Sequence, residues 1–151
     1  KKEMVDMGFV GEVVDLELTE VKKVVAREIV PVISPIAEGE AQETLNVNAD
    51  IAAGAIAGAL QAAKLIYLSD VPGLMRDPAQ KDSLIPSVNR EEIRMLMDEK
   101  IIEGGMIPKT ESAVRALGGG VSKVHFIDGR IPHALLLEIF TNTGIGTEMI
   151  P

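Results

Sequence analysis

The stretch that most restricts the fold runs from residue 49 to residue 63 and consists almost entirely of Ala, Gly, Ile and Leu. Asn48 directly before it is a natural N-cap, and Asp50 lies in the first turn, where negative charge suits the helix dipole. So many small side chains predict a helix that lets neighbouring backbone approach closely. Because Gln61 and Lys64 interrupt the apolar window, we expect this helix to pack against a sheet rather than to span a membrane.

Predicted strands and helices alternate along the chain. Strands are expected at residues 29–36, 64–68, 121–127 and 147–150. Helices are expected at residues 20–27, 49–63, 110–117 and 131–140, and after a capping box formed by Asn89 and Glu92. This alternation predicts an α/β fold with a largely parallel sheet covered on both faces. Since no repeat or linker divides the chain, residues 1–151 are expected to form a single domain.

The composition excludes several classes of function. The net charge of −8 argues against binding to a nucleic-acid backbone, and three Phe with one Tyr offer little for base stacking. The absence of cysteine excludes disulfides and thiolate metal sites and fits a reducing, cytoplasmic location. His125 and His133 cannot form a zinc site by themselves, so no protein-bound metal is expected. His125 lies within a predicted strand, where a structural role is favoured over a catalytic one.

Polar residues follow the predicted strand at 64–68. Ser69, Asp70, Val71 and Gly73 lie at its carboxyl end, which is where ligands gather in open α/β sheets. A polar pair followed by a glycine turn would suit a nucleotide. An ordinary turn explains these residues equally well.

A second polar group precedes the small-residue helix. Asn46, Asn48 and Asp50 could converge at the N-terminus of that helix. Capping accounts for Asn48 and the helix dipole accounts for Asp50, so a purely structural explanation is as well supported as a binding site. Asn46 has no evident structural role.

A third group lies at residues 104–109, where two glycines precede Lys109. Lys109 is expected at the start of a helix, where the dipole disfavours a cation. A lysine beside free helix amides is understandable if a phosphate binds there. The alternative is a solvated lysine at a turn.

Taken together and in this order, four segments resemble N-acetylglutamate kinase of the amino-acid kinase family. They are residues 46–50, 68–73, 104–109 and 128–138, and residues 8–11 and 144–147 also fit. The resemblance covers nearly the whole chain. It implies a three-layer αβα sandwich with a mostly parallel central sheet, as in carbamate kinase. It also implies transfer of the γ-phosphoryl group of ATP, with Mg²⁺, to the side-chain carboxylate of N-acetyl-L-glutamate in arginine biosynthesis.

The resemblance also implies roles for individual residues. Asn46 and Asn48 match the substrate-binding region, Asp50 matches the carboxylate that holds the catalytic lysines, and Lys109 matches the lysine that meets the phosphates. The residues matching the nucleotide site, besides Lys109, are Ser69, Asp70, Val71, Gly73, Gly105 and Met106. Some members are arginine-inhibited hexamers, which implies a homo-oligomer and an arginine effector site at His133, Glu138 and Gly144. Alternatively, Glu138 caps a helix and Gly144 forms a turn.

Members of this family are longer at the N-terminal side, where they carry glycine-rich phosphate loops and a second catalytic lysine. The chain is therefore expected to be the C-terminal, ATP-side portion of a kinase and to be inactive alone. Two alternatives stay open. The acceptor could be carbamate, glutamate, aspartate or UMP, or the chain could be a non-catalytic nucleotide- or effector-binding module.

Overall fold

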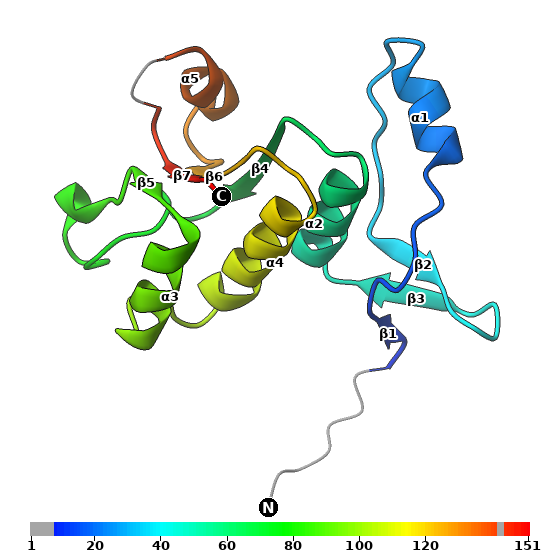
Figure 1. Ribbon diagram of the computed structural model, residues 1–151, viewed down its shortest axis with the longest axis horizontal. Helices are drawn as coiled ribbons and strands as arrows, with labels where there is room; N and C mark the ends of the chain where they lie inside the picture. The colour runs from blue at the N-terminus through cyan, green and yellow to red at the C-terminus, as the bar shows by residue number, and fades with distance from the viewer. Residues whose placement is uncertain (1–7, 142–143) are drawn as a thin grey trace, which may run out of the picture. The chain divides into compact units, whose positions relative to one another are not determined.

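Figure 1 shows a computed structural model of the chain, which describes residues 8–141 and 144–151. Contacts divide the chain after Ala52 into two compact units, residues 1–52 and 53–151. Each unit is described by itself below. The expectation that both belong to a single domain stays a prediction.

The first unit contains a small three-stranded sheet. Its elements are β1 (Val10–Gly11), α1 (Thr19–Val25), β2 (Ile36–Glu38), β3 (Thr44–Val47) and the start of α2 (Ala49–Ala59). The sheet has the order β1-β3-β2, with β1 parallel and β2 antiparallel to β3. The prediction of a strand at 29–36 is wrong except at Ile36. Pro31 and Pro35 explain this, because proline has no amide hydrogen to donate to a neighbouring strand.

The second unit contains a four-stranded sheet with the order β4-β6-β7-β5. Its strands are β4 (Lys64–Ser69), β5 (Ser87–Val88), β6 (Lys123–Asp128) and β7 (Thr147–Met149). β4 runs parallel to β6 and β5 runs parallel to β7, whereas β6 and β7 are antiparallel. Two of the three pairings are thus parallel, and the mostly parallel sheet is confirmed with one antiparallel step at its centre.

Three longer helices and one short turn complete this unit. They are η1 (Lys81–Ser83), α3 (Arg90–Asp98), α4 (Met106–Gly118) and α5 (Ala134–Phe140). None of the helices in the described part of the chain is long and apolar enough to cross a membrane. The predicted capping box starts α3: the Asn89 side chain accepts hydrogen bonds from the amides of Glu91 and Glu92, and Glu92 accepts one from the Asn89 amide.

Side chains alternate between the two faces of β6, and this alternation produces the layers. Val124 and Phe126 enter the main core with α3 and α4, where Phe126 stacks on Tyr67 of β4 at 5.2 Å between ring centroids. His125 points the other way and meets Glu138 of α5. Helices therefore cover the sheet from both sides, as Figure 1 shows for α4 and α5. The predicted αβα layering is confirmed in this unit.

The small residues of α2 allow the close approach that their composition predicts. A Cβ atom added at Gly54 would lie 3.1 Å from both the Ser112 carbonyl oxygen and the Tyr67 hydroxyl. A Cβ atom at Gly119 would lie 3.1 Å from the Cα atom of Gly58. Backbone of α2 and the C-terminal half of α4 therefore meet at glycines, where any larger side chain would separate them.

Candidate functional site

The carboxyl ends of β4 and β6 meet at one edge of the sheet. Ser69 is paired in register with Asp128, and the amide of Gly129 donates a hydrogen bond of 2.8 Å to the Ser69 carbonyl. Asp70 follows Ser69 directly and is exposed. This is the edge at which the strand-end rule predicts a ligand, and it gathers Ser69 and Asp70 as expected.

An ion pair at this edge was not singled out by the sequence reasoning. Asp128 accepts three hydrogen bonds from Arg130, one from its amide at 2.9 Å and two from its guanidinium at 2.9 and 2.7 Å. The guanidinium contact holds the pKa of Asp128 at about 2, well below its ordinary value. Asp70 adds a further favourable charge for Arg130. The sequence signals for the pair were its position at the end of a predicted strand and its place in the matching segment 128–138.

A hollow of about 240 Å³ lies between the loop after β4 and the turn before α4. Val71 and Gly73 line it from the loop, and Met106 lines it as the first residue of α4. The structure thus brings together members of two groups that the sequence identifies separately. Arg76 and Lys100 also line the hollow and were not predicted, because surface cations in loops carry no distinctive pattern.

Lys109 is the fourth residue of α4 and is half-buried. The helix begins four residues before its predicted start at 110, since proline is tolerated in a first turn. The amides of Met106 and Ile107 donate to the carbonyls of Glu103 and Gly104 at 3.1 and 3.2 Å, and Pro108 has no amide hydrogen. The expectation that Lys109 stands beside free helix amides is therefore wrong for these three positions. Its phosphate role stays a prediction.

The residues matched to the substrate lie around the start of α2. Asn46 is exposed on the central strand β3, where its amide donates to the Phe9 carbonyl at 2.8 Å. Asn48 caps α2 as predicted, because its side-chain oxygen accepts hydrogen bonds from the amides of Asp50 and Ile51 at 2.9 and 3.2 Å. Asp50 is half-buried in the first turn. The binding role of all three stays a prediction.

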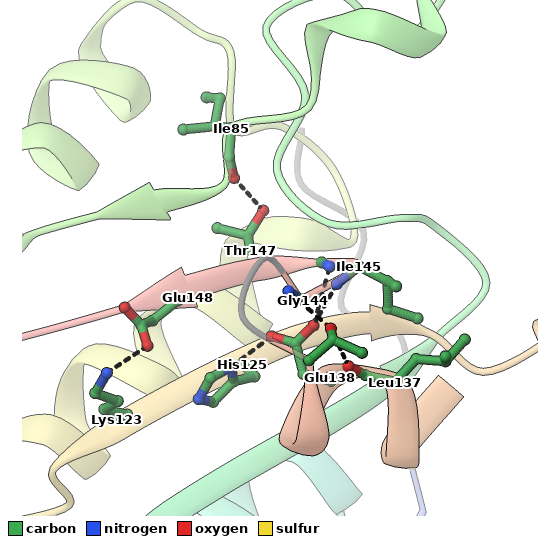
Figure 2. A network of polar contacts seen from close by, with 11 residues as sticks. Ile85, Lys123, His125, Leu137, Glu138, Gly144, Ile145, Thr147 and Glu148 are labelled. Atoms are coloured by element: carbon green, nitrogen blue, oxygen red, sulfur yellow. Dashed lines mark hydrogen bonds and ion pairs between the residues drawn. The ribbon is translucent and has the colours of Figure 1, made fainter. Parts of the chain in front are cut away.

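Two of the residues matched to an effector, Glu138 and Gly144, are seen close together in Figure 2. Glu138 is buried, and one of its carboxylate oxygens lies 2.6 Å from Nδ1 of His125. The other oxygen accepts from the amides of Ile145 at 2.7 Å and Gly146 at 3.1 Å. Burial alone would raise the pKa of Glu138, but these donors outweigh it and lower the pKa below its ordinary value.

Glu138 and Gly144 lie next to each other, as the resemblance implies. A Cβ atom at Gly144 would lie 2.8 Å from the Glu138 carboxylate, and the positive φ of 62° also favours glycine there. His133 is the exposed N-cap residue of α5, with a positive φ of its own. Glu138 lies in the middle of α5, so the suggestion that it caps a helix is wrong, whereas the turn at Gly144 stays a prediction.

Metal-ligating side chains do not cluster in residues 8–141 and 144–151: no three His, Asp or Glu groups lie close enough to hold an ion. At the sheet edge, Asp128 is already engaged by Arg130, whose guanidinium holds the pKa of this carboxyl at about 2.

Comparisons with known proteins show what the chain is similar to. The acetylglutamate kinase of Desulfitobacterium hafniense is 54% identical over 145 residues, which is 96% of this chain and 49% of that protein. The acetylglutamate kinase of Akkermansia muciniphila is 52% identical over 147 residues, covering 97% of this chain and 50% of that one. The chain thus spans about half the length of the curated relatives it matches, and the resemblance to acetylglutamate kinases is confirmed.

Solved structures share the fold. N-acetylglutamate synthase from Neisseria gonorrhoeae, complexed with coenzyme A and L-arginine, matches with a TM-score of 0.86 at 28% identity, over 97% of this chain and 33% of that chain. Carbamate kinase from Giardia lamblia matches with a TM-score of 0.67 at 19% identity, over 93% of this chain and 46% of that one, and so supports the fold alone. The sequence model of the amino acid kinase family matches residues 2–128, and the chain therefore belongs to the amino acid kinase family.

Proposed function

We propose that this chain forms the ATP-binding part of an acetylglutamate kinase, which phosphorylates the side-chain carboxylate of N-acetyl-L-glutamate in arginine biosynthesis. The observation that carries the proposal is the convergence of Val71, Gly73 and Met106 on one hollow. Its apolar wall suits a nucleoside, and Arg76 and Lys100 on its rim suit phosphates. The curated relatives at about 50% identity, all acetylglutamate kinases, support the choice of acceptor.

For this phosphoryl transfer, the protein mainly has to position the two substrates and stabilise negative charge. A carboxylate acceptor is already a nucleophile, so no general base is needed, and Asp50 serves to hold catalytic lysines in place. Lys109 stabilises negative charge on the transferring phosphoryl group. Mg²⁺ would be held mainly by the nucleotide phosphates, where it would supply positive charge to offset theirs. Asn46 and Asn48 contribute to the acetylglutamate side of the site.

We extend the proposal to an arginine effector at Glu138, Gly144 and His133. A buried carboxylate is the group that recognises a guanidinium best, through paired hydrogen bonds. Glu138 already accepts from His125, Ile145 and Gly146, so arginine would have to replace some of these donors. Isothermal titration with L-arginine tests this site, and a Glu138→Gln variant should bind at least about tenfold more weakly.

The acceptor is tested with a chimera of the Desulfitobacterium hafniense kinase in which this chain replaces the matching 145-residue stretch. ADP release should be fastest with N-acetyl-L-glutamate and fall by at least about a hundredfold in the Lys109→Ala chimera, as expected for a group that stabilises transition-state charge. Faster turnover of glutamate, carbamate, aspartate or UMP would identify a different kinase. No turnover with any acceptor, together with ATP binding by the chain, would favour a non-catalytic nucleotide-binding module.

The remaining parts of the proposal concern the whole protein. A cytoplasmic homo-oligomer is expected by analogy with arginine-sensitive acetylglutamate kinases. Light scattering on the purified protein distinguishes this assembly from a monomer. The 151-residue chain alone should release no ADP with acetylglutamate, because it spans about half the length of its relatives.

A further inference from the structure

The hydroxyl group of Thr147 occupies an unusual place at the start of β7 (Figure 2). It is fully buried, accepts a hydrogen bond of 2.8 Å from the Leu74 amide and donates one of 2.7 Å to the Ile85 carbonyl. Ile85 in turn donates from its amide to the Leu74 carbonyl at 2.8 Å. In an antiparallel pair, the Leu74 amide would donate directly to the Ile85 carbonyl. Here the Thr147 hydroxyl lies between these two groups and bonds to both. Only a group that both donates and accepts can do this.

The loop that Thr147 holds is the loop that lines the proposed nucleotide site. Leu74, Gly73 and Arg76 all face the hollow. Gly73 lies so close to Thr147 that an added Cβ atom would come within 2.5 Å of the hydroxyl oxygen, and its φ of 151° falls in a region that side chains rarely adopt. The Arg76 amide closes the rest of the loop by donating to the Ser83 carbonyl at 2.9 Å. The position of this wall therefore depends on β7.

Thr147 is fixed from its other side as well. The two residues before it, Ile145 and Gly146, donate their amides to the buried carboxylate of Glu138. A Cβ atom at Gly146 would clash with the Phe126 carbonyl oxygen, so this backbone lies directly on β6. Residues 145–147 thus form a short, tightly held bridge between Glu138 and Leu74.

We propose that Thr147 is a positioning residue for the nucleotide site, and that residues 145–147 connect the segment held by Glu138 to the loop lining the hollow. The assignment rests on the proposed function, in which that loop contacts ATP. A threonine that merely fills the core would be replaceable by valine, which has nearly the same shape. A positioning hydroxyl would be replaceable by serine instead.

The test compares Thr147→Val with Thr147→Ser in the 151-residue chain by isothermal titration with Mg²⁺–ATP and by hydrogen exchange at the Leu74 amide. Thr147→Val should weaken ATP binding by roughly tenfold and speed Leu74 exchange by a similar factor, because a buried amide loses its acceptor. Thr147→Ser should stay within about twofold of the wild type in both measurements. Glu138→Gln should speed Leu74 exchange to a smaller extent.

Thr110→Val is the matched control, since Thr110 is fully buried and its hydroxyl has no hydrogen-bond partner among the described residues. It should leave Leu74 exchange unchanged. Equal effects of valine and serine at position 147, or wild-type exchange in Thr147→Val, would overturn the proposal. Failure of the wild-type chain to bind ATP would instead count against the proposed function, and the exchange measurement would still decide the role of Thr147.

Discussion

Replacing Glu138 by alanine should destabilise the second unit by about 3–5 kcal/mol, because it removes a buried carboxylate that accepts three hydrogen bonds. Three donors lose their acceptor: Nδ1 of His125 and the amides of Ile145 and Gly146. A buried donor left unpaired costs about 1–3 kcal/mol, so three donors that all stayed out of contact with water would cost about 3–9 kcal/mol. Ile145 is only half-buried, so water can reach its amide and the lower part of the range is expected.

The Glu138→Gln variant keeps the shape of the side chain but removes its negative charge, so it tests the two contributions separately. Glutamine keeps an oxygen that can accept from Ile145 and Gly146, but it turns an amide group toward Nδ1 of His125. The ring must then carry its proton on Nε2, a buried atom with no partner in the described part of the structure. The expected loss is about 1–2 kcal/mol, the penalty for one unsatisfied donor.

The assay is urea unfolding followed by near-ultraviolet circular dichroism. Tyr67 is the only tyrosine and the chain has no tryptophan, so this signal reports on the buried Tyr67–Phe126 stack of the second unit. Glu148→Gln is the control, because its ion pair with Lys123 at 2.7 Å is partly exposed and should be worth less than about 1 kcal/mol. Losses below about 0.5 kcal/mol for both Glu138 variants would refute the reasoning.

Three further predictions follow from single contacts. Asn89→Ala removes the capping box of α3 and should cost about 1 kcal/mol in urea unfolding, whereas Asn89→Asp should cost little; equal losses would contradict the capping role. Gly146→Ala should cost at least about 3 kcal/mol, because the new methyl group meets the rigid backbone carbonyl of Phe126; a wild-type midpoint would show that the strand can shift. Asp128 has a folded pKa of about 2 against an ordinary 3.8, so its contribution is complete above pH 3.8 and is lost as the pH falls toward 2. Asp128→Asn should therefore flatten the acid dependence of stability between these pH values, and an unchanged acid profile would argue against the Arg130 contact.

The sequence predicted helices and strands well where they depend on interactions between residues that are close together in the chain. Asn48 and Asn89 were identified as caps from residue type and spacing, and both accept the expected amide hydrogen bonds. The strand at 64–68 was also located correctly, and the small-residue helix begins at Ala49 as predicted but ends at Ala59, four residues before the predicted end at 63. The strand predicted at 29–36 failed because its apolar residues were weighed above Pro31 and Pro35. The start of α4 was misplaced because Pro108 was taken as a boundary.

The candidate site was predicted only in pieces. Val71, Gly73 and Met106 were identified from separate motifs, and the fold brings them to one hollow. Arg76, Lys100 and the Asp128–Arg130 pair were missed, because an isolated charge has no signature until its neighbours are known. Thr147 was identified only as the start of a predicted strand and as part of a matching segment, since its two hydrogen-bond partners lie 73 and 62 residues away along the chain.

The small-residue stretch at residues 49–63 shows which features the sequence determined and which the tertiary structure decided. Its composition by itself determined that the backbone of a helix there would lie close to neighbouring backbone, because glycine and alanine have no large side chain that would separate the two. Which backbone it meets was decided by the tertiary structure, which places Gly54 against Ser112 and Gly58 against Gly119. Helix formation and capping depend on neighbours within one turn of the helix, so they can be predicted from the sequence itself. The hydroxyl bridge of Thr147 and the buried carboxylate of Glu138 depend on which strands become neighbours, and that choice is made by the packing of the whole unit.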